Sequence, residues 1–122
     1  MYAICSRPEN NKCKNLKITK NIAAGGAYAG FVVPASNCGD YTKFRDNVAH
    51  SIDGFKGGAG GVIFPDPSEP DQIPTCYEAS YFTAYKCTQQ GIIGFKTAKR
   101  ILYHHITTFD NFYGTGSNIE KP

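Results

Sequence analysis

Three kinds of side chain in the C-terminal half of the sequence can move protons or hold a phosphate group. Glu78 stands in the segment CYEASYF, Arg100 stands in KRILYHHI, and His104 and His105 belong to that second segment. Both segments have the composition of strands, so the carboxylate and the guanidinium can face each other across neighbouring strands. A base, a cation and a histidine acid are the groups that RNA cleavage by transesterification requires. A surface ion pair between strands is the simpler interpretation of Glu78 and Arg100.

The two adjacent histidines do not predict a metal site. On a regular strand His104 and His105 point to opposite faces of the sheet, so they cannot bind one ion together. The sequence contains no CxxC motif and no Cys/His spacing typical of zinc, so we expect neither metal nor cofactor. The glycine-rich segment at 57–61 follows an expected helix, whereas phosphate-binding loops precede one. We interpret that segment as a connector.

Five cysteines in a small chain rich in glycine and tyrosine favour a secreted protein with at least two disulfides. The sequence cannot choose among the connectivities of these disulfide candidates, which are Cys5, Cys13, Cys38, Cys76 and Cys87. A cytosolic protein with reduced thiols is the alternative. The sequence shows no signal peptide, and Met1 is interpreted as an initiator placed before a mature chain.

Composition excludes several classes of protein. The chain has 122 residues, a net charge of +3, 19% charged residues and 13% aromatic residues, which is too apolar for a disordered tail. We find no internal sequence repeat and no apolar run long enough to span a membrane. The length predicts one domain. The many glycines, tyrosines and phenylalanines favour strands and turns over long helices.

The spacing of apolar residues nevertheless predicts one helix over 42–53. Phe44, Val48 and Ile52 fall at i, i+4 and i+8, and Gly54 stands where a helix often ends. Strand-like runs follow, and they predict an antiparallel sheet of 61–65, 77–83, 99–106 and 110–114, with QQGIIG as a loop. At the N-terminus, 2–6 and 14–19 read as a hairpin. The expected fold class is therefore α+β, with one main helix packed on a central antiparallel β-sheet.

The order of these elements over 40–118 resembles the guanyl-specific fungal ribonucleases, with 1–39 as an N-terminal hairpin and extension and 119–122 as a tail. The resemblance rests on VIFPDPSEP, CYEASYF, GFKTAKRILY and NFYGTG. It implies that Glu78 corresponds to the catalytic base and Arg100 to the phosphate-binding arginine. Asp66 stands where that family has a histidine, and YGTGSN lacks the histidine acid. The resemblance therefore implies an inactive ribonuclease-like site, since a carboxylate at that position repels phosphate.

A damaged ribonuclease-like site together with the start Tyr2-Ala3-Ile4-Cys5 resembles the ribonuclease-like secreted effectors of cereal powdery mildew fungi. This resemblance implies a secreted monomer that acts in the host cell. Its partners would be host plant proteins, including an immune receptor, and weakly bound RNA, with no membrane partner. The candidate RNA- and phosphate-binding residues are Lys96, Lys99 and Arg100.

Two alternatives to a non-enzymatic effector remain open from the sequence. One is an active secreted ribonuclease that uses Glu78, Arg100 and one of the three histidines, which are His50, His104 and His105. The other is a disulfide-stapled toxin or binding module unrelated to RNA. An RNA cleavage assay with a Glu78→Ala control separates the ribonuclease from the other two.

Overall fold

The computed structural model of the protein describes residues 2–3, 16–34, 36–37, 43–54, 57–64, 75–95 and 98–118. These residues form fourteen short β-strands and no helix. The described part of the chain accordingly holds no helix long and apolar enough to cross a membrane.

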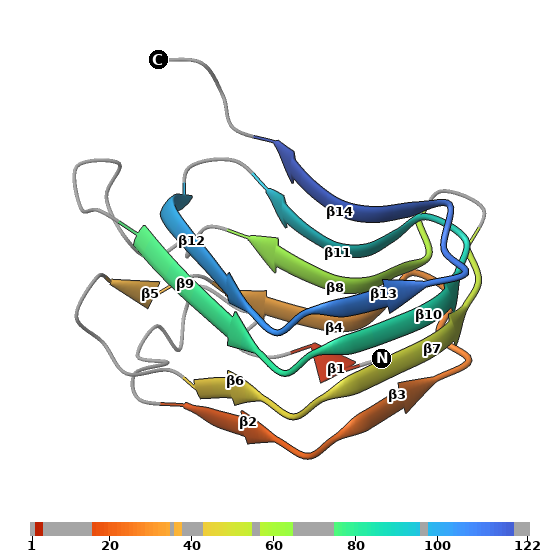
Figure 1. The fold of residues 1–122 in the computed structure, drawn as a ribbon, viewed down its shortest axis with the longest axis horizontal. Helices are drawn as coiled ribbons and strands as arrows, with labels where there is room; N and C mark the ends of the chain where they lie inside the picture. The colour runs from red at the N-terminus through yellow and green to blue at the C-terminus, as the bar shows by residue number, and fades with distance from the viewer. Residues whose placement is uncertain are drawn as a thin grey trace.

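Most strands follow one another in groups of three, and each group makes one coil of the chain (Figure 1). Coil 1 contains β2 (Lys17–Thr19), β3 (Ile22–Ala24) and β4 (Ala29–Pro34), and coil 2 contains β6 (Lys43–Arg45), β7 (Val48–Ile52) and β8 (Ala59–Phe64). Coil 3 contains β9 (Thr75–Ser80), β10 (Thr83–Cys87) and β11 (Gln90–Phe95), and coil 4 contains β12 (Ala98–His104), β13 (Thr107–Phe109) and β14 (Tyr113–Asn118). Outside the coils, β1 (Tyr2–Ala3) pairs in parallel with β4, and β5 (Ser36–Asn37) pairs antiparallel with β9.

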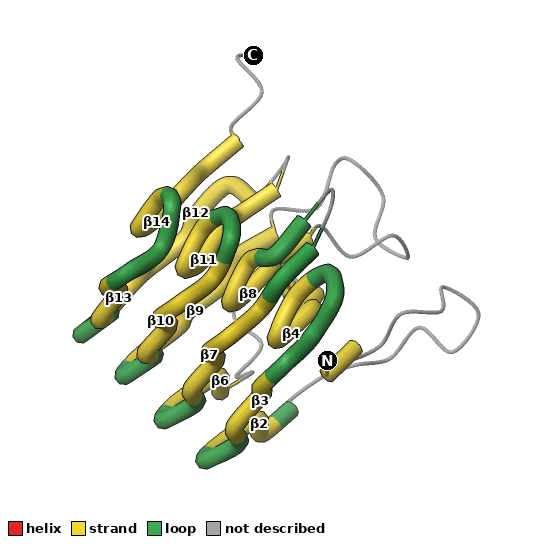
Figure 2. The backbone as a smooth tube through the Cα atoms, turned by 90° about the vertical axis from the view of Figure 1, so that its right-hand side faces the viewer, coloured by secondary structure: helices red, strands yellow, loops and turns green. Residues whose placement is uncertain are grey.

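Equivalent strands of successive coils pair in parallel and build three sheets. Sheet 1 contains β2, β6, β9 and β12, sheet 2 contains β3, β7, β10 and β13, and sheet 3 contains β4, β8, β11 and β14, with β1 beside β4. Figure 2 shows the coils stacked in chain order, with β13 and β14 at one end and β2 and β3 at the other. This architecture is a parallel β-helix, in which each coil buries its inner side against its neighbours.

Left-handed backbone conformations mark the corners of every coil. The corner between sheets 1 and 2 contains Lys20, Asp46, Tyr81 and His105, whose φ angles lie between 51° and 59°. The corner near the end of sheet 2 contains Gly25, Ser51, Lys86 and Asp110, with φ between 52° and 70°. Strand register aligns each set in one column along the stack. This conformation costs a non-glycine residue about 1–2 kcal/mol, so pairing between coils must hold it.

The main core is built from inward side chains of all three sheets. Phe31 from β4, Phe44 from β6 and Phe82 from the corner between β9 and β10 are buried, and their ring centroids lie 5.3 to 6.0 Å apart. Two of these pairs meet edge to face, which is a favoured arrangement of aromatic rings. Ile18, Ile52 and Ile92 complete the cluster around them. The core therefore runs along the axis of the stack.

Small residues allow sheets 2 and 3 to approach each other closely. Gly30, Gly60, Gly91 and Gly114 occupy equivalent positions in sheet 3, and Ala23, Ala49, Ala84 and Thr108 occupy the facing column of sheet 2. A Cβ at Gly60 would overlap the carbonyl oxygen of Gly91 and lie 2.7 Å from the Cβ of Ala84. Only glycine fits there because both neighbours belong to the packed backbone and core.

Two asparagines complete the hydrogen bonding of corners in the preceding coil. Asn47 is fully buried; its Nδ2 donates to the carbonyl of Ile18 at 2.8 Å, and its Oδ1 accepts from the amide of Asn21 at 3.0 Å. In the same way, Nδ2 of Asn111 donates to the carbonyl of Ala84 at 3.0 Å, and its Oδ1 accepts from the amide of Cys87 at 2.9 Å. In both corners the carbonyl and the amide belong to residues three apart that flank a left-handed residue. Each asparagine side chain therefore gives a hydrogen-bond partner to a backbone carbonyl and a backbone amide that, because of the turn, cannot bond to a neighbouring strand.

The predicted helix over 42–53 is wrong, because this segment forms β6, a corner and β7. Phe44, Asn47, Ala49 and Ile52 are buried, whereas Val48 is half-buried on the outer side. Two short strands joined by a left-handed corner at Asp46 space their inward residues three, two and three apart. That spacing imitates the period of a helix although no helix is present.

The antiparallel sheet is also wrong, since the main strands pair in parallel in three sheets. Strands occur near the predicted runs, but QQGIIG, which was expected to be a loop, lies in β11 and its approach. Among the described residues of the expected N-terminal hairpin, β1 pairs with β4 and β2 pairs with β6, so these two strands do not pair with each other. An α+β ribonuclease-like fold is therefore excluded. The coils differ in length, so the chain has a structural repeat without a fixed sequence period.

Candidate ligand-binding groove

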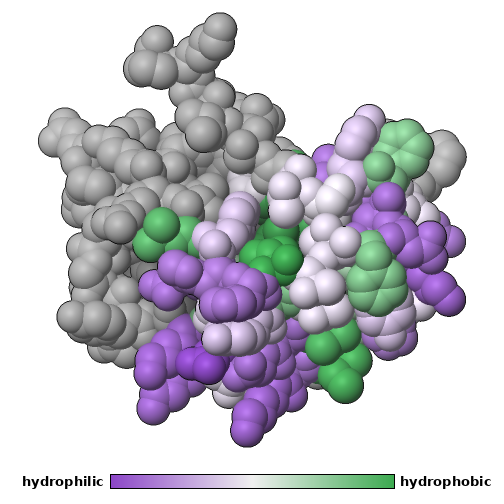
Figure 3. Space-filling view, viewed as in Figure 1, coloured by the Kyte–Doolittle hydropathy of each residue, from purple (hydrophilic) through white to green (hydrophobic). Residues whose placement is uncertain are grey.

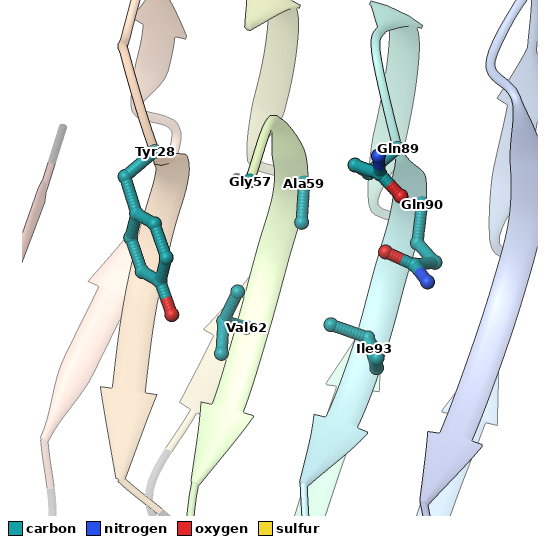
Figure 4. A pocket seen from close by; sticks show the side chains of 7 residues that line it. All are labelled: Tyr28, Gly57, Ala59, Val62, Gln89, Gln90 and Ile93. Atoms are coloured by element: carbon teal, nitrogen blue, oxygen red, sulfur yellow. The ribbon is translucent and has the colours of Figure 1, made fainter. Parts of the chain in front are cut away.

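A groove lies on the outer side of sheet 3 and crosses coils 1 to 3 (Figure 4). Its volume is about 240 Å³, and it is lined by Tyr28, Gly57, Ala59, Val62, Gln89, Gln90 and Ile93. Figure 4 shows Tyr28 on one side, Ala59 and Val62 of β8 in the middle, and Gln89, Gln90 and Ile93 on the other side. The groove is therefore framed by three neighbouring strands of one sheet and the residues that precede them.

Backbone contacts from coil 2 fix the position of Tyr28. The carbonyl oxygen of Tyr28 accepts hydrogen bonds from the amides of Gly58 at 2.6 Å and Ala59 at 3.2 Å. Gly57 lies against the ring so closely that a Cβ there would be 2.7 Å from the ring carbon Cδ2. The Tyr28 residue is nevertheless 50% exposed. Gly57 and Gly58 thus allow the backbone to pack closely against Tyr28, and the ring of Tyr28 remains exposed to a ligand.

The floor of the groove is apolar and separate from the main core. Ala29, Ala59 and Val62 form a second buried cluster, against which Val32 and Ile93 pack. Register places Ala29 beside Ala59, and Val32, Val62 and Ile93 in one column, on the outer side of sheet 3. An apolar strip on the outside of a β-helix is a surface on which an apolar ligand face can lie.

Two glutamines supply the polar groups of the groove. The main chain of Gln89 is held between coils, since its amide donates to Gly58 at 3.2 Å and its carbonyl accepts from Tyr113 at 3.1 Å. The side-chain amides of Gln89 and Gln90 have no hydrogen-bond partner among the described residues. Each amide group can both donate and accept. The lining contains no charged side chain, so the groove suits a neutral ligand with hydroxyl or amide groups.

Of the residues proposed for RNA cleavage, the described structure brings Glu78 and His104 close together and offsets Glu78 from Arg100 along neighbouring strands. Glu78 lies exposed on the outer side of β9, and its Oε1 is 3.7 Å from Nε2 of His104, which is also exposed. The two strands β9 and β12 are neighbours as expected, but Arg100 aligns with Cys76 and Glu78 aligns with Leu102. The pair expected across the strands is therefore offset by two positions. Asp66 and Lys96 lie outside the described residues, and Lys99 belongs to β12.

The histidines occupy positions that the sequence reasoning placed differently. His104 ends β12 and His105 is the left-handed corner residue of coil 4, so both are exposed and the expected opposite faces of one strand are wrong. The ring of His105 stacks on Tyr81 at 4.5 Å, and Arg45 lies 4.8 Å over the same tyrosine ring. His50 belongs to sheet 2, where its ring stacks on Tyr85 at 4.9 Å.

Cys87 is the disulfide candidate whose thiol the structure describes, and this thiol is free and buried. Burial raises the pKa of the Cys87 thiol, while a backbone hydrogen bond involving Ile52 lowers it to a smaller extent. Cys76 lies in β9, and Cys5, Cys13 and Cys38 lie outside the described residues. Among the described residues no group of three or more histidine, cysteine or acidic side chains is placed to hold a metal ion.

Sequence reasoning missed the groove because its residues come from three coils. Tyr28, Gly57 and Gln89 are about thirty residues apart, and only the parallel register brings them together. The glycine pair at 25–26 before Tyr28 and the pair at 57–58 were the one local signal, since glycine often allows a close backbone approach. Comparison with protein-family models, with curated proteins and with solved structures finds no match to this chain.

Proposed function

We propose that this protein is a non-enzymatic binding module that holds a neutral carbohydrate in the groove of sheet 3. The observation that carries the proposal is the composition of the groove: one exposed tyrosine ring, two side-chain amides, an apolar floor and no charge. A sugar ring has an apolar face of C–H groups and a polar rim of hydroxyls. It therefore needs both kinds of surface side by side.

Each part of a sugar ring has a partner in the groove. The C–H face can lie on the Tyr28 ring and on the Val62 and Ile93 side chains, where water is displaced from apolar surface. The hydroxyl rim can exchange hydrogen bonds with the amides of Gln89 and Gln90 and with the Tyr28 hydroxyl. Amides act as donors and acceptors at once, which suits hydroxyl groups that do the same.

The size and the charge of the groove narrow the ligand class. Its volume of about 240 Å³ lies below the roughly 300–1,000 Å³ of pockets for drug-sized molecules, so it accommodates about one ring. The uncharged lining offers a phosphate group no cation. Binding should therefore depend little on ionic strength, in contrast to RNA binding, which weakens steeply with salt.

Titration calorimetry with a panel of neutral hexose and N-acetylhexosamine oligosaccharides tests the proposal. We expect at least one neutral oligosaccharide to bind, and Tyr28→Ala to weaken its affinity about tenfold or more, about 1.4 kcal/mol. Tyr81→Ala is the matched control, because Tyr81 is a similarly exposed tyrosine outside the groove. Equal affinity of the wild type and Tyr28→Ala, or absence of binding to the whole panel, contradicts the proposal.

Secretion, action in a host cell and binding of host proteins stay predictions of the sequence. A carbohydrate-binding module is compatible with a secreted protein. The ribonuclease alternative is tested by the RNA cleavage assay with Glu78→Ala. If the wild type cleaves RNA and this substitution abolishes the cleavage, the protein is an enzyme and the proposal of a non-enzymatic binding module is wrong.

A further inference from the structure

The two ends of the β-helix differ in how well their inward side chains are covered. At the coil 1 end, Ile18 and Ala23 are only 7% and 3% exposed. At the coil 4 end, the residues in the same two columns, Tyr103 and Thr108, are both partly exposed. The coil 4 end thus presents the open cross-section of the core, whereas the coil 1 end is closed.

The strands of coil 4 also have an unpaired edge in the described structure. β12, β13 and β14 each end their sheet, with a partner strand only on the coil 3 side. The amide of Thr107 donates to the carbonyl of Phe82 at 2.9 Å, so the amide and carbonyl of the next residue, Thr108, point the other way. An unpaired strand edge is a template for pairing with another chain.

Aromatic side chains gather at the same end. On the outer side of sheet 2 the rings of His50, Tyr85 and Phe109 form a ladder with successive centroids 4.9 Å apart. Tyr85 is stacked on both faces, but Phe109 ends the ladder and is 53% exposed. Phe112 and Tyr113, which meet edge to face at 4.7 Å, are 72% and 53% exposed.

We call the three exposed aromatic side chains of coil 4, which are Phe109, Phe112 and Tyr113, the aromatic patch. Figure 3 shows hydrophobic residues among hydrophilic ones on the side of the molecule that Figure 1 presents, on which β13 and β3 lie. A cluster of exposed aromatics beside an unpaired strand edge is typical of a protein interface.

We propose that the coil 4 end binds the coil 4 end of a second copy of this chain and forms a closed two-fold dimer. Stacking of coil 4 on coil 1 of the next copy is disfavoured, because β1 already occupies the sheet 3 edge of coil 1 and the inward residues Ile18 and Ala23 are covered, although β2 and β3 also end their sheets. A two-fold axis across the coil 4 end pairs one strand antiparallel with its own copy and closes the contact at two subunits.

The extent of coil 4 fits such an interface. The segment from Ala98 to Asn118 is close to the roughly 20–30 residues a side of a stable protein interface. The dimer covers the partly exposed side chains of Tyr103, Ile106 and Thr108 together with the aromatic patch. The groove of sheet 3 lies across coils 1 to 3, so the dimer leaves it open. The sequence led to the expectation of a monomer, and the proposed dimer is the alternative to that expectation.

Sedimentation velocity over a range of protein concentrations tests the dimer. We expect a concentration-dependent dimer in the wild type, and at least tenfold weaker association in both Phe109→Lys and Phe112→Lys, since a lysine at an edge opposes strand pairing. The matched control is Ile22→Lys, because Ile22 is 62% exposed on the same sheet at the coil 1 end. Circular dichroism checks that each variant is folded.

Three outcomes would overturn the proposal. The first is a wild-type monomer at all concentrations. The second is a dimer that Ile22→Lys disrupts while the two phenylalanine variants do not, which places the interface on coil 1. The third is growth into open-ended fibres, which indicates head-to-tail stacking. Carbohydrate binding by Phe109→Lys is measured in parallel, so failure of the dimer is distinguished from failure of the groove.

Discussion

At two corners of this protein, an asparagine side chain forms the backbone hydrogen bonds that a neighbouring strand would otherwise form. Asn47 is fully buried and bonds a carbonyl and an amide at the first corner of coil 1, while Asn111 bonds a carbonyl and an amide at the second corner of coil 3. A buried backbone group that loses its partner costs about 1–3 kcal/mol. The stability of these corners therefore depends on single side chains that lie outside the lining of the groove.

Replacing Asn47 by alanine should lower the free energy of unfolding by about 3 kcal/mol, because two buried backbone groups lose their partner. Urea denaturation followed by circular dichroism measures the change. The control is Asn21→Ala, which removes a half-buried side chain that donates to Thr19 and Asn47, and we expect a loss of about 1 kcal/mol or less. Similar losses in the two variants would show that Asn47 does not have this role.

Cys87 should make the protein less stable at alkaline pH. Burial raises the pKa of its thiol above the ordinary value of 9.0, so the folded state holds the proton more tightly than the unfolded chain does. This contribution is fully present below pH 9.0 and is lost as the pH rises through the raised pKa. Burial also raises the pKa of the Tyr103 hydroxyl above 10.0, which adds to the effect.

The measurement is the unfolding midpoint from pH 8 to pH 11, with Cys87→Ala compared with the wild type. We expect the alkaline decrease to be smaller in Cys87→Ala and smaller still when Tyr103→Phe is added. An unchanged pH profile in both variants would refute the assignment. A thiol reagent should also modify native Cys87 more slowly than unfolded Cys87, because the buried thiol is protonated.

At the scale of single elements, the chain alternates short strands with left-handed corners. The sequence indicated strands near β8, β9, β12 and β14 because their β-branched and aromatic residues are typical of strands. It did not indicate the corners, since lysine and tyrosine at Lys20 and Tyr81 carry no signal for a positive φ. Because the corner was not recognised in the sequence, the spacing of Phe44 and Ile52 suggested one helix where the structure has two strands.

The candidate site was less predictable than the strands. Glu78 and Arg100 were correctly placed on neighbouring strands, but a parallel register offsets them, and register cannot be read from either strand alone. The groove depends on the alignment of β4, β8 and β11, which are far apart in sequence. Its residues are ordinary types without a motif, so only the assembled coils reveal it.

The aligned glycines of sheet 3, which include Gly60 and Gly91, allow a direct test of the close packing between sheets 2 and 3. Gly60→Ala should reduce the free energy of unfolding by about 3 kcal/mol or prevent folding, since its Cβ would overlap the backbone of Gly91 and crowd Ala84. The neighbouring Gly61→Ala is the control, because its Cβ would meet Ile92 and Phe82 at 3.4 Å, an ordinary contact distance. Thermal unfolding of both variants distinguishes them, and equal midpoints would contradict the close approach of the sheets.

At the scale of the whole molecule, the stability of each coil depends on its contacts with the coils before and after it along one axis. Each coil contacts only its neighbours, so a terminal coil with an open side has fewer stabilising contacts than an inner one. Coil 4 has that open side, and its inward residues are less buried than those of coil 3. Opening of the structure should therefore begin at coil 4.

Hydrogen exchange measured on the Phe109→Lys variant, which should be monomeric, tests this order. We expect backbone amides of β13 that bond to coil 3, such as that of Thr107, to exchange at least tenfold faster than equivalent amides of β7, such as that of Val48. Uniform protection of all four coils would instead indicate one cooperative unit. In the wild type, added protection of coil 4 at high concentration would report dimer formation.

The spacing of the corners determines where the gene can gain or lose codons. The two left-handed residues of each coil are five apart, as in 20 to 25, 46 to 51, 81 to 86 and 105 to 110. From one coil to the next, the first corner advances by 26, 35 and 24 residues, from 20 to 46, to 81 and to 105. A single codon inserted between Asp46 and Ser51 would turn a buried residue outward.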